Sequence, residues 1–597
     1  MVNRLRFSFT IIFWATVFSA FAQNQLTLDV KRFERHSEIA WTYTGSDAVY
    51  FQVFVSKSGG AYEEVQRSTG KKYFYFTDAK VLEEYHLYVR ALNGLLEPLA
   101  VSDTIFVQEK SMTDEELVDM VQEATFRYFW DFGHPTSGMA RERNTSGDVV
   151  TTGGTGFGIM ALLAGIENGY ITRSQGLQRM IKMVSFLQFA DKFHGVFPHW
   201  MDGRTGDVFP FSQYDNGGDL VETAFLMQGL LAARSFFNEN NTDEQALRKI
   251  ITKLWEAVEW DFYTKNNSGV LYWHWSPQHE WKINHAIRGY NEALIVYLLA
   301  ISSPTHPVPP SYWKSGWAGG NYKNGLSYYS FLLPVGPAYG GPLFFAHYSY
   351  LGFDPRGIKD SYCNYFFQNT QHTLINRAYC ISNPLKHKAY SADCWGLTAS
   401  DDPNGYVAHE PVNRDNGTIT PTAALSSIPY TPEYSIDALR YFYFEEGERL
   451  WGEFGFYDAF NPSKNWYASS YLAIDQGPIV VMMQNYRTGL LWNHFMSNPE
   501  IKQGLDKIGF VEDVLVTEEI GEKQYGFKIY PSPSQLGFYI QSNVWPDRLT
   551  ITTALGIEIE KISGYQGQWM GSNLPSGLYY VTAIFGKDRI TVPFIKL

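Results

Sequence analysis

The spacing of apolar residues changes twice along this chain of 597 residues, and these changes constrain its fold more than any other feature. Between residues 23 and 108, apolar and polar residues alternate in short runs such as EIAWTYTG and YHLYVRALN. Between 111 and 510, apolar residues recur every three or four positions, as on one face of a helix. Across 518–597 the alternation returns. The sequence therefore predicts a multidomain protein, an all-α centre flanked by two small β domains.

Residues 1–22 have the composition of a secretory signal peptide. Arg4 and Arg6 precede the apolar run FSFTIIFWATVF, and the AFA of residues 20–22 fits a cleavage site. The apolar run is shorter than the ~20 residues that cross a membrane. We expect removal of this peptide, no membrane span, and a location outside the cell or on its surface.

The strands expected within 23–108 are separated by turns at intervals near ten residues, a pattern typical of a small antiparallel β-sandwich. The segment resembles a fibronectin type III module, with Trp41 on an early strand and Tyr85, Tyr88 and Ala91 on a late one. For this segment we favour a role as a spacer over one in substrate binding.

The central segment predicts many helices joined alternately by short turns and by long loops rich in Gly, Pro, Trp, Tyr and Asn. Thr113 and Glu116 form a capping box at the first helix. Helical hairpins of this kind favour a ring, the (α/α)6 toroid, and the long loops are expected to carry function. The further helices are expected at 155–168, 173–190, 219–238, 243–262, 289–301, 340–352, 359–376, 434–450 and 472–498.

The C-terminal segment, 518–597, predicts a small β-sandwich. It resembles the type A sorting domain of the Bacteroidetes type IX secretion system through YPSP at 530–533, LPSGLY at 574–579 and the final basic residue Lys596. Ser532 stands where Asn is commoner. The resemblance implies that the secretion machinery is a partner; release and surface attachment both remain open.

Composition narrows the class of ligand. With 48 basic and 61 acidic residues the net charge is −13, which argues against nucleic acid as a partner. Aromatic residues make up 17% of the chain, which fits the packing of large helices and the stacking of sugar rings equally well. Cys363, Cys380 and Cys394 allow one disulfide at most, and we expect buried thiols.

Three carboxylates stand together in FSQYDNGGDLVETAFLMQGLLAAR, residues 211–234. Asp219 and Glu222 fit a D-x-x-E capping box at the start of a helix, which explains both without catalysis. Asp215 lies in the preceding loop and has no such explanation. Helix capping, a metal site and an acid–base site all remain open for this group.

A second polar and aromatic cluster is LYWHWSPQHEWKINHAIRGYNEAL, residues 271–294. Its three histidines are spaced by five and six positions, which fits no metal motif, so we expect no metal. Glu292 stands at the start of an apolar helix, and an acidic residue in the first turn of a helix is favourable whether or not it has a catalytic role. Beside Trp, Tyr and His, partial desolvation would also raise the pKa of its carboxyl and make it a general acid.

Glycoside hydrolysis needs two carboxyl groups, and Glu292 with the pair Asp215 and Asp219 can supply them. Asp458 and Asp475 each fit a base or a loop anchor. Aromatic and polar residues near these stretches are candidates for sugar contacts, with ordinary packing as the alternative. The candidate substrate-binding residues are Trp200, Arg204, Tyr214, Trp273, Trp275, Trp281, Arg288, Trp395, Asp401 and Asp458.

Residues 112–510 resemble the glucoamylase-like glycoside hydrolase family that contains bacterial endo-β-1,2-glucanases. The resemblance rests on TTGGTGFGIMAL, VFPHWMDGRTG, YDNGGDLVETAFLMQGLL, YWHWSP, GYNEAL, GPLFFAHYSYLGFDPRG and FGFYDAFN. It implies an (α/α)6 barrel that cleaves β-1,2-glucan internally to sophorooligosaccharides, and analogy with related clans of this fold favours inversion over retention. We expect no cofactor and a monomer. The resemblance also implies that Asp215, Asp219 and Glu292 are essential. Hydrolysis of another glucan linkage, a lyase, and a surface glycan-binding protein are the alternatives.

Overall fold

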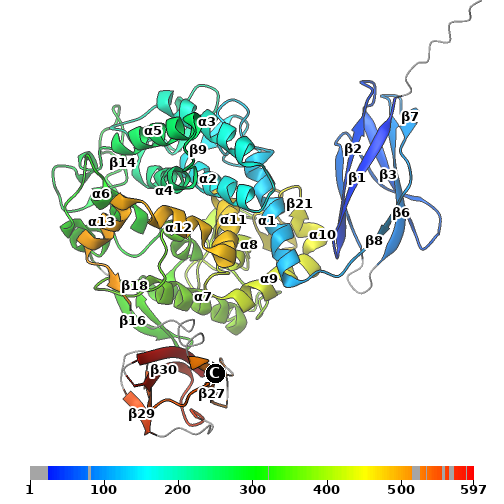
Figure 1. Cartoon of the computed structure of the whole chain (residues 1–597). Coiled ribbons are helices and arrows are strands. Elements are labelled where there is room, and N and C mark those ends of the chain that lie inside the picture. The colour runs from blue at the N-terminus through cyan, green and yellow to red at the C-terminus, as the bar shows by residue number, and fades with distance from the viewer. Residues whose placement is uncertain are drawn as a thin grey trace, which may run out of the picture. The chain divides into compact units, whose positions relative to one another are not determined.

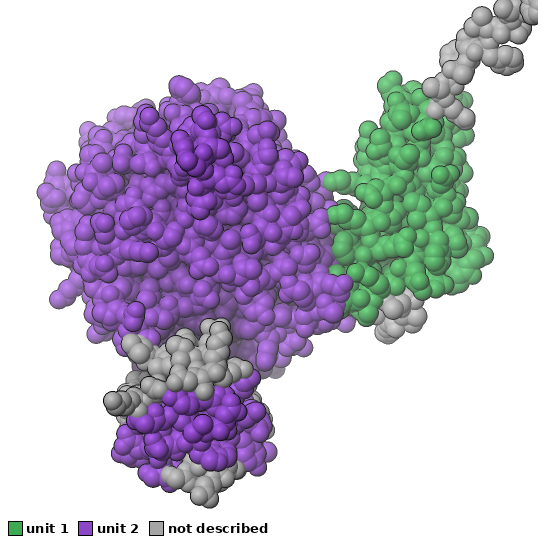
Figure 2. All heavy atoms as spheres, in the orientation of Figure 1, with its two compact units in different colours: residues 1–112 green, residues 113–597 purple. Residues whose placement is uncertain are grey.

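The structure is a computed structural model that describes residues 24–77, 83–320, 322–513, 525–530, 532, 534, 536–553, 558–563, 570–586 and 588–596. The predicted signal peptide lies outside the described residues, as do Pro531 and Pro533 of the YPSP stretch. The chain divides into two compact units, residues 1–112 and residues 113–597 (Figure 2). Among the described residues, no helix is both long enough and apolar enough to cross a membrane.

The first unit consists of two antiparallel sheets. Their inward faces share one core that includes Trp41 and Tyr85, while outward residues are more exposed. The alternation in the sequence follows from this one-sided burial. One sheet contains β1 (Leu26–Arg32), β2 (His36–Tyr43) and β5 (Lys72–Phe76), and the other β4 (Glu63–Ser68), β3 (Tyr50–Lys57), β6 (Glu84–Leu92), β7 (Pro98–Val101) and β8 (Ile105–Gln108).

The second unit holds all the α-helices (Figure 1) of the described residues. They are α1 (Asp114–Trp130), α2 (Thr152–Glu167), α3 (Arg173–Phe189), α4 (Leu220–Phe236), α5 (Thr242–Glu256), α6 (Leu294–Ser302), α7 (Tyr365–Ser382), α8 (Pro421–Leu425), α9 (Pro432–Phe444), α10 (Gly447–Leu450), α11 (Ala473–Thr488), α12 (Leu490–Met496) and α13 (Pro499–Ile508).

These helices differ in how they are buried. Nearly every residue of α2, α4, α6 and α11 is buried, whereas α3, α5 and α13 bury only one stripe. A helix that is apolar on all sides belongs inside a domain, and one with a single apolar stripe belongs on its surface. Helix α2 packs against both α4 and α11, so these three form the centre of the unit.

Two glycines let α2 and α4 approach closely. A Cβ atom on Gly156 would lie 2.1 Å from the carbonyl oxygen of Phe225, and one on Gly229 would lie 2.2 Å from the carbonyl oxygen of Gly156. Only glycine leaves room for such backbone contact. Close contact also brings the first turns of the two helices together, where the acidic residues lie.

Several of the predicted helices are wrong in detail; for example, the segment 434–450 forms two helices, α9 and α10. Residues 340–352 form short 3-10 turns instead of one helix, because Gly340 and Gly341 have positive φ angles and Pro342 follows them. The segment 472–498 is divided at Gly489, which has a φ of 69° and ends α11. The turns after Pro342 place Phe344 and Tyr348 beside a cavity.

Several predicted loops contain short strand pairs. The pair formed by β12 (Gly218–Asp219) and β14 (His274–Trp275) joins the two carboxylate-bearing sequence stretches and places Asp219 opposite His274. Three short strands, β9 (Val149–Thr151), β10 (Trp200–Asp202) and β11 (Val208–Phe209), form one small sheet. The remaining pairs are β13 (Leu271–Tyr272) with β15 (Ala286–Ile287); β16 (Lys323–Tyr328) with β17 (Phe331–Val335); β18 (Ile358–Lys359) with β25 (Val511–Glu512); β19 (Ala399–Asp402) with β20 (Gly405–Ala408); β21 (Trp451–Gly452) with β22 (Gly455–Phe456); and β23 (Phe460–Asn461) with β24 (Trp466–Tyr467).

The C-terminal part of the chain consists of β-strands. A four-stranded antiparallel sheet has the order β29-β28-β30-β31, and β26 pairs with β27. Tyr579 belongs to the core of this part. The strands are β26 (Lys528–Tyr530), β27 (Tyr539–Gln541), β28 (Arg548–Thr553), β29 (Glu558–Ser563), β30 (Gly577–Phe585) and β31 (Asp588–Lys596).

The close approach of α2 and α4 predicts the effect of Gly229→Ala. The new methyl group would meet the backbone of Gly156, so the helices must separate, and we expect a loss of about 1–3 kcal/mol of unfolding free energy. Thermal unfolding measures this loss. Gly70→Ala is the control, because there the nearest atom to a new Cβ is 3.6 Å away. A melting temperature of Gly229→Ala equal to that of wild type would show that the helices are not held this close.

Candidate active site

Three adjoining cavities run through the loops that connect the central helices. The acidic cavity, of about 310 Å³, is lined by Asp219, Glu222 and Glu292 among others. The central cavity, of about 450 Å³, shares five lining residues with it: His199, Glu222, Phe344, Tyr348 and Ile474. The hairpin cavity, of about 570 Å³, is lined by residues of the β19–β20 and β23–β24 hairpins and shares Arg143 and Tyr406 with the central cavity. The three cavities therefore form one continuous cleft.

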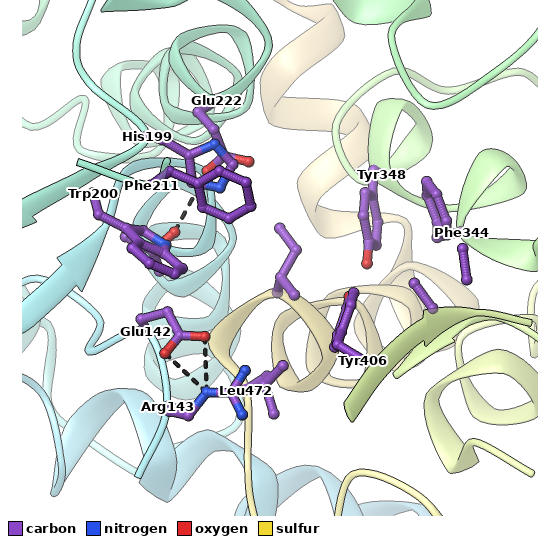
Figure 3. Close-up of a pocket in the computed structure, with 14 residues that line it drawn as sticks. Glu142, Arg143, His199, Trp200, Phe211, Glu222, Phe344, Tyr348, Tyr406 and Leu472 are labelled. Carbon is purple, nitrogen blue, oxygen red and sulfur yellow. Dashed lines mark hydrogen bonds and ion pairs between the residues drawn. The ribbon is translucent and has the colours of Figure 1, made fainter. Parts of the chain in front are cut away.

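Figure 3 shows the central cavity from within. His199, Trp200 and Phe211 lie on one side, and Phe344 and Tyr348 lie across from them. Aromatic rings face an open space here, with carboxylates at its edge. A cavity that combines apolar faces with a few fixed polar groups is typical of a ligand site.

Asp219 has both carboxylate oxygens in use. One oxygen accepts hydrogen bonds from the backbone N–H groups of Val221 and Glu222, each at 2.9 Å, and so caps α4 as predicted. The other lies 2.8 Å from Nδ1 of His199. The side chain is fully buried, so these contacts hold the carboxyl group of Asp219 in place at the floor of the acidic cavity.

Glu222 does not complete the capping box that the sequence predicts. Its carboxylate instead accepts a hydrogen bond of 2.7 Å from the backbone N–H of Gly153 in the first turn of α2. Burial raises the pKa of Glu222. The residue therefore belongs to α4 but caps its neighbour α2, which fixes the two helix ends to each other.

His199 lies among these carboxylates and lines both the acidic and the central cavities. Burial disfavours its charged form, but Glu222, Asp219 and Asp215 together raise its pKa to about 9. Its ring also stacks on Phe211 at 4.2 Å. At neutral pH His199 is therefore an imidazolium held against a cluster of buried carboxyl groups.

Asp215 lies beneath this group and lines none of the three cavities. It is 2% exposed, with one oxygen 3.3 Å from Nε2 of His274 and the other 3.9 Å from Nδ1 of His199. Burial and the charge of Asp219 raise its pKa to about 7. Asp215 therefore has no direct contact with these cavities, and His199, which lines two of them, is the neighbour through which we expect its charge to act.

His199, Asp215 and Asp219 also have the spacing of a small metal site, since one ligand atom of each lies within 4.8 Å of the others. In the structure Nδ1 of His199 lies 2.8 Å from a carboxylate oxygen of Asp219, so that nitrogen already has a partner. We therefore interpret the group as an ion pair.

Glu292 stands two residues before α6 and lines the acidic cavity. Its backbone carbonyl accepts a hydrogen bond from the hydroxyl of Ser349. Burial and the nearby charges of Glu222 and Asp219 raise its pKa to about 7. Much of the Glu292 population therefore carries a proton at neutral pH, as a general acid requires.

A second group of carboxyl groups lies near the junction of the central and hairpin cavities. The backbone N–H of Asp401 donates to Asp458 at 2.7 Å, and the guanidinium of Arg143 contacts Asp401 at 3.2 Å. Burial and Asp401 raise the pKa of Asp458 to about 7, and burial and Asp458 raise that of Asp475 well above its usual range. These carboxyl groups hold a proton between them in the neutral range.

The residues predicted to bind substrate are not all in one place. Trp200, Trp273 and Asp401 line the cleft, and Asp458 lies next to Asp401. Trp395 is fully buried in the core, which leaves no face of its ring for a sugar. The remaining five residues line none of the three cavities: Arg204, Tyr214, Trp275, Trp281 and Arg288.

Contacts with other protein groups account for three of these five. Trp275 and Trp281 pack against Phe262, so they stabilise the loop instead of facing the cleft. Arg204 is exposed and forms ion pairs with Asp202 and Asp148.

Several residues of the cleft were missed by the sequence analysis. Glu142, Arg143 and Trp466 line it and lie in no motif of the sequence, whereas Phe344 and Tyr348 lie in GPLFFAHYSYLGFDPRG, where nothing distinguishes them from core residues.

The chain is similar to several known proteins. Residues 284–499, which include Glu292, match the family model described as "Putative glucoamylase". The chain is 47% identical over 506 residues to an exo beta-1,2-glucooligosaccharide sophorohydrolase (non-reducing end) of Parabacteroides distasonis, a match that covers 80% of this chain and 70% of the relative.

Two solved structures are similar as well. A beta-1,2-glucanase from Parabacteroides distasonis is 46% identical, with a TM-score of 0.76 over 82% of this chain and 73% of the other. An endo-beta-1,2-glucanase from Chitinophaga pinensis, solved with sophorotriose and glucose, is 53% identical, with a TM-score of 0.66 over 67% of this chain and 99% of the other. Both are similar to this chain in fold as well as in sequence.

The charge state of His199 predicts how stability depends on pH. Because its pKa in the folded protein is about 9, above the ordinary 6.5, its ion pairs stabilise the fold fully below pH 6.5 and are lost as the pH rises through 9. We expect wild type to lose unfolding free energy over this range and His199→Gln to lose less. Urea unfolding at several pH values measures both.

His306→Gln is the matched control, since His306 pairs with Asp261 away from the cleft. If wild type and His199→Gln lose equal stability between pH 6.5 and 9, the pKa of His199 is not raised in the folded protein.

Proposed function

Because this chain belongs to the glucoamylase-like family of glycoside hydrolases, we propose that it hydrolyses β-1,2-glucan, internally, to sophorooligosaccharides. The observation that carries the proposal is that Glu292, whose pKa is raised by burial, lines a cavity that Asp219 and Glu222 also line. The relatives named as β-1,2-glucan hydrolases support the linkage. The endo-acting relative from Chitinophaga pinensis supports internal cleavage, and the exo-acting relative from Parabacteroides distasonis makes release of sophorose from the chain end the alternative.

In this proposal Glu292 is the general acid. Its carboxyl group donates a proton to the glycosidic oxygen as the bond between that oxygen and the anomeric carbon breaks. A water molecule attacks the anomeric carbon from the opposite face, which inverts its configuration, and gives up one proton to a carboxylate of the cleft. The products are two shorter chains, and the site is restored when Glu292 takes up a proton and the carboxylate that accepted one from water releases it.

Asp215 and Asp219 act through His199 in this account. Asp219 holds the ring by Nδ1, and Asp215 adds negative charge beneath it, so the imidazolium stays fixed at the edge of both cavities. A fixed cation donates hydrogen bonds to sugar hydroxyls or to the attacking water. Trp200 and Trp273 offer ring faces on which a glucosyl ring can stack.

We also propose the finer architecture and location that the sequence predicts. The two sheets of residues 24–108 are consistent with a fibronectin type III-like sandwich, and the inner and outer helices with an (α/α)6 toroid. The strands of 525–596 are consistent with a sorting domain. On this proposal the mature protein is a monomer that leaves the cell through the outer membrane.

The role of Glu292 predicts that Glu292→Gln folds normally but loses activity on β-1,2-glucan by roughly 100-fold to 10,000-fold, because the amide cannot donate the proton. Glu256→Gln, at the exposed end of α5, is the matched control and keeps wild-type activity. Mass spectrometry of products from β-1,2-glucan, laminarin, a cellulose derivative and starch measures both linkage and rate. Turnover near wild type in Glu292→Gln would show that another group is the acid.

The pKa of about 7 for Glu292 predicts that kcat falls as the pH rises above 7, since the acid loses its proton. Glu222 raises that pKa by its charge, so Glu222→Gln should move the fall in kcat to lower pH. Initial rates at saturating substrate measure the profile, with Glu256→Gln again as the control. A profile of Glu222→Gln identical to that of wild type would contradict the assignment.

A further inference from the structure

The hairpin cavity, of about 570 Å³, is outside the site where Glu292 lies but opens into it. It shares Arg143 and Tyr406 with the central cavity, which in turn shares five residues with the acidic cavity. A chain bound at Glu292 and running through the central cavity would reach it. We propose that the hairpin cavity is a distal subsite that binds further glucosyl units of the same β-1,2-glucan chain, an inference that rests on the proposed function.

Two aromatic side chains that line this cavity have ring faces with no stacking partner among the described residues. Tyr406 is 50% exposed, and Trp466 is half-buried on β24. Among the described residues, neither ring stacks on another ring or a cation, and neither the indole N–H nor the hydroxyl is hydrogen-bonded. Solvent-facing rings of this kind are the surfaces on which the apolar faces of sugars stack.

The neighbouring Tyr467 shows the opposite arrangement. Its ring lies 3.7 Å from the guanidinium of Arg449 and stacks on Phe460, and its hydroxyl donates to Glu446. This tyrosine has a structural role already. Trp466, the preceding residue on the same strand, has no such stacking partner among the described residues, which leaves its indole ring available to a ligand.

Polar groups surround the aromatic faces. The carboxylate of Asp401 accepts from Ser470 at 2.6 Å and pairs with Arg143, so these groups are fixed in place. Thr145 and Ser469 are exposed and offer hydroxyl groups at the rim. Fixed polar groups around a ring face are what a glucosyl unit needs, because its rim hydrogen-bonds while its faces are apolar.

The walls of the hairpin cavity are tied together before any ligand binds. The side-chain amide of Asn144 donates to the carbonyl of Ser469 at 3.0 Å and accepts from the backbone N–H of Tyr471 at 3.1 Å. Arg143 joins the same loop to Asp401 on β19. A site that is organised in advance loses less conformational entropy on binding, so its contacts add to affinity.

Such a subsite gives long chains an advantage that short chains lack. A trisaccharide held at Glu292 ends before the hairpin cavity, whereas an octasaccharide or the polymer extends into it. The KM for long chains should therefore be lower than that for short ones. Trp466→Ala should shrink this advantage about tenfold, the effect of removing one aromatic anchor.

The test measures kcat and KM for a series of β-1,2-glucooligosaccharides with wild type, Trp466→Ala, Trp466→Phe and Phe189→Ala. Phe189 is 87% exposed and lines none of the cavities, so its variant is the control and keeps the wild-type ratio of KM values. Trp466→Phe should retain most of the advantage of long chains, because it keeps a ring. If Trp466→Ala does not fold, Ser469→Leu, which fills the cavity without removing the ring, should shrink the advantage in the same way.

Calorimetric binding in the Glu292→Gln background provides a second readout without turnover. We expect the added Trp466→Ala to weaken the octasaccharide about tenfold more than the trisaccharide. Equal effects on both chain lengths, or none, would overturn the distal subsite while leaving the proposed hydrolysis intact. Failure of wild type to cleave β-1,2-glucan of any length would instead overturn both.

Discussion

The structure depends on a buried ion pair between His199 and Asp219, joined at 2.8 Å. Asp219 also caps α4, and Glu222 one turn later caps α2, so the negative charges of the site hold the ends of two central helices. Gly156 and Gly229 let those helices touch farther along. Asp219 and Glu222 therefore line the proposed active site and also stabilise the fold, so a substitution at either residue should affect activity and stability together.

Crowding of carboxyl groups in a buried place also sets their protonation. Like charges that cannot all ionise push pKa values upward, and Asp215, Glu292 and Asp458 each reach about 7. Asp215 lies outside the three cavities and Glu292 lines one of them, so carboxyl groups with similar pKa values occupy different positions relative to a ligand. Desolvation is the largest cause in each case, which ties the chemistry directly to the packing of the surrounding loops.

Much of this architecture could be predicted from the sequence, and the failures have physical causes. Long apolar runs predicted the buried central helices well, because burial on all sides leaves few polar positions. The capping role of Asp219 was predictable since its partners are two and three residues away. The hydrogen-bond partner of Glu222, the backbone N–H of Gly153, is 69 residues away, so spacing along the chain could not identify it. Trp395 is buried in the core and Trp466 is half-buried, a difference that the residue type alone does not reveal.

The central claim is that this cluster of carboxyl groups hydrolyses β-1,2-glucan with Glu292 as the acid. Proton NMR of linear β-1,2-glucan, recorded as the wild-type protein acts on it, tests the claim most directly, because it reports linkage and anomeric configuration together. The account predicts short β-1,2-linked products whose new reducing ends first appear in the α configuration. First appearance of the β anomer would contradict inversion, and an unchanged glucan would contradict the function itself.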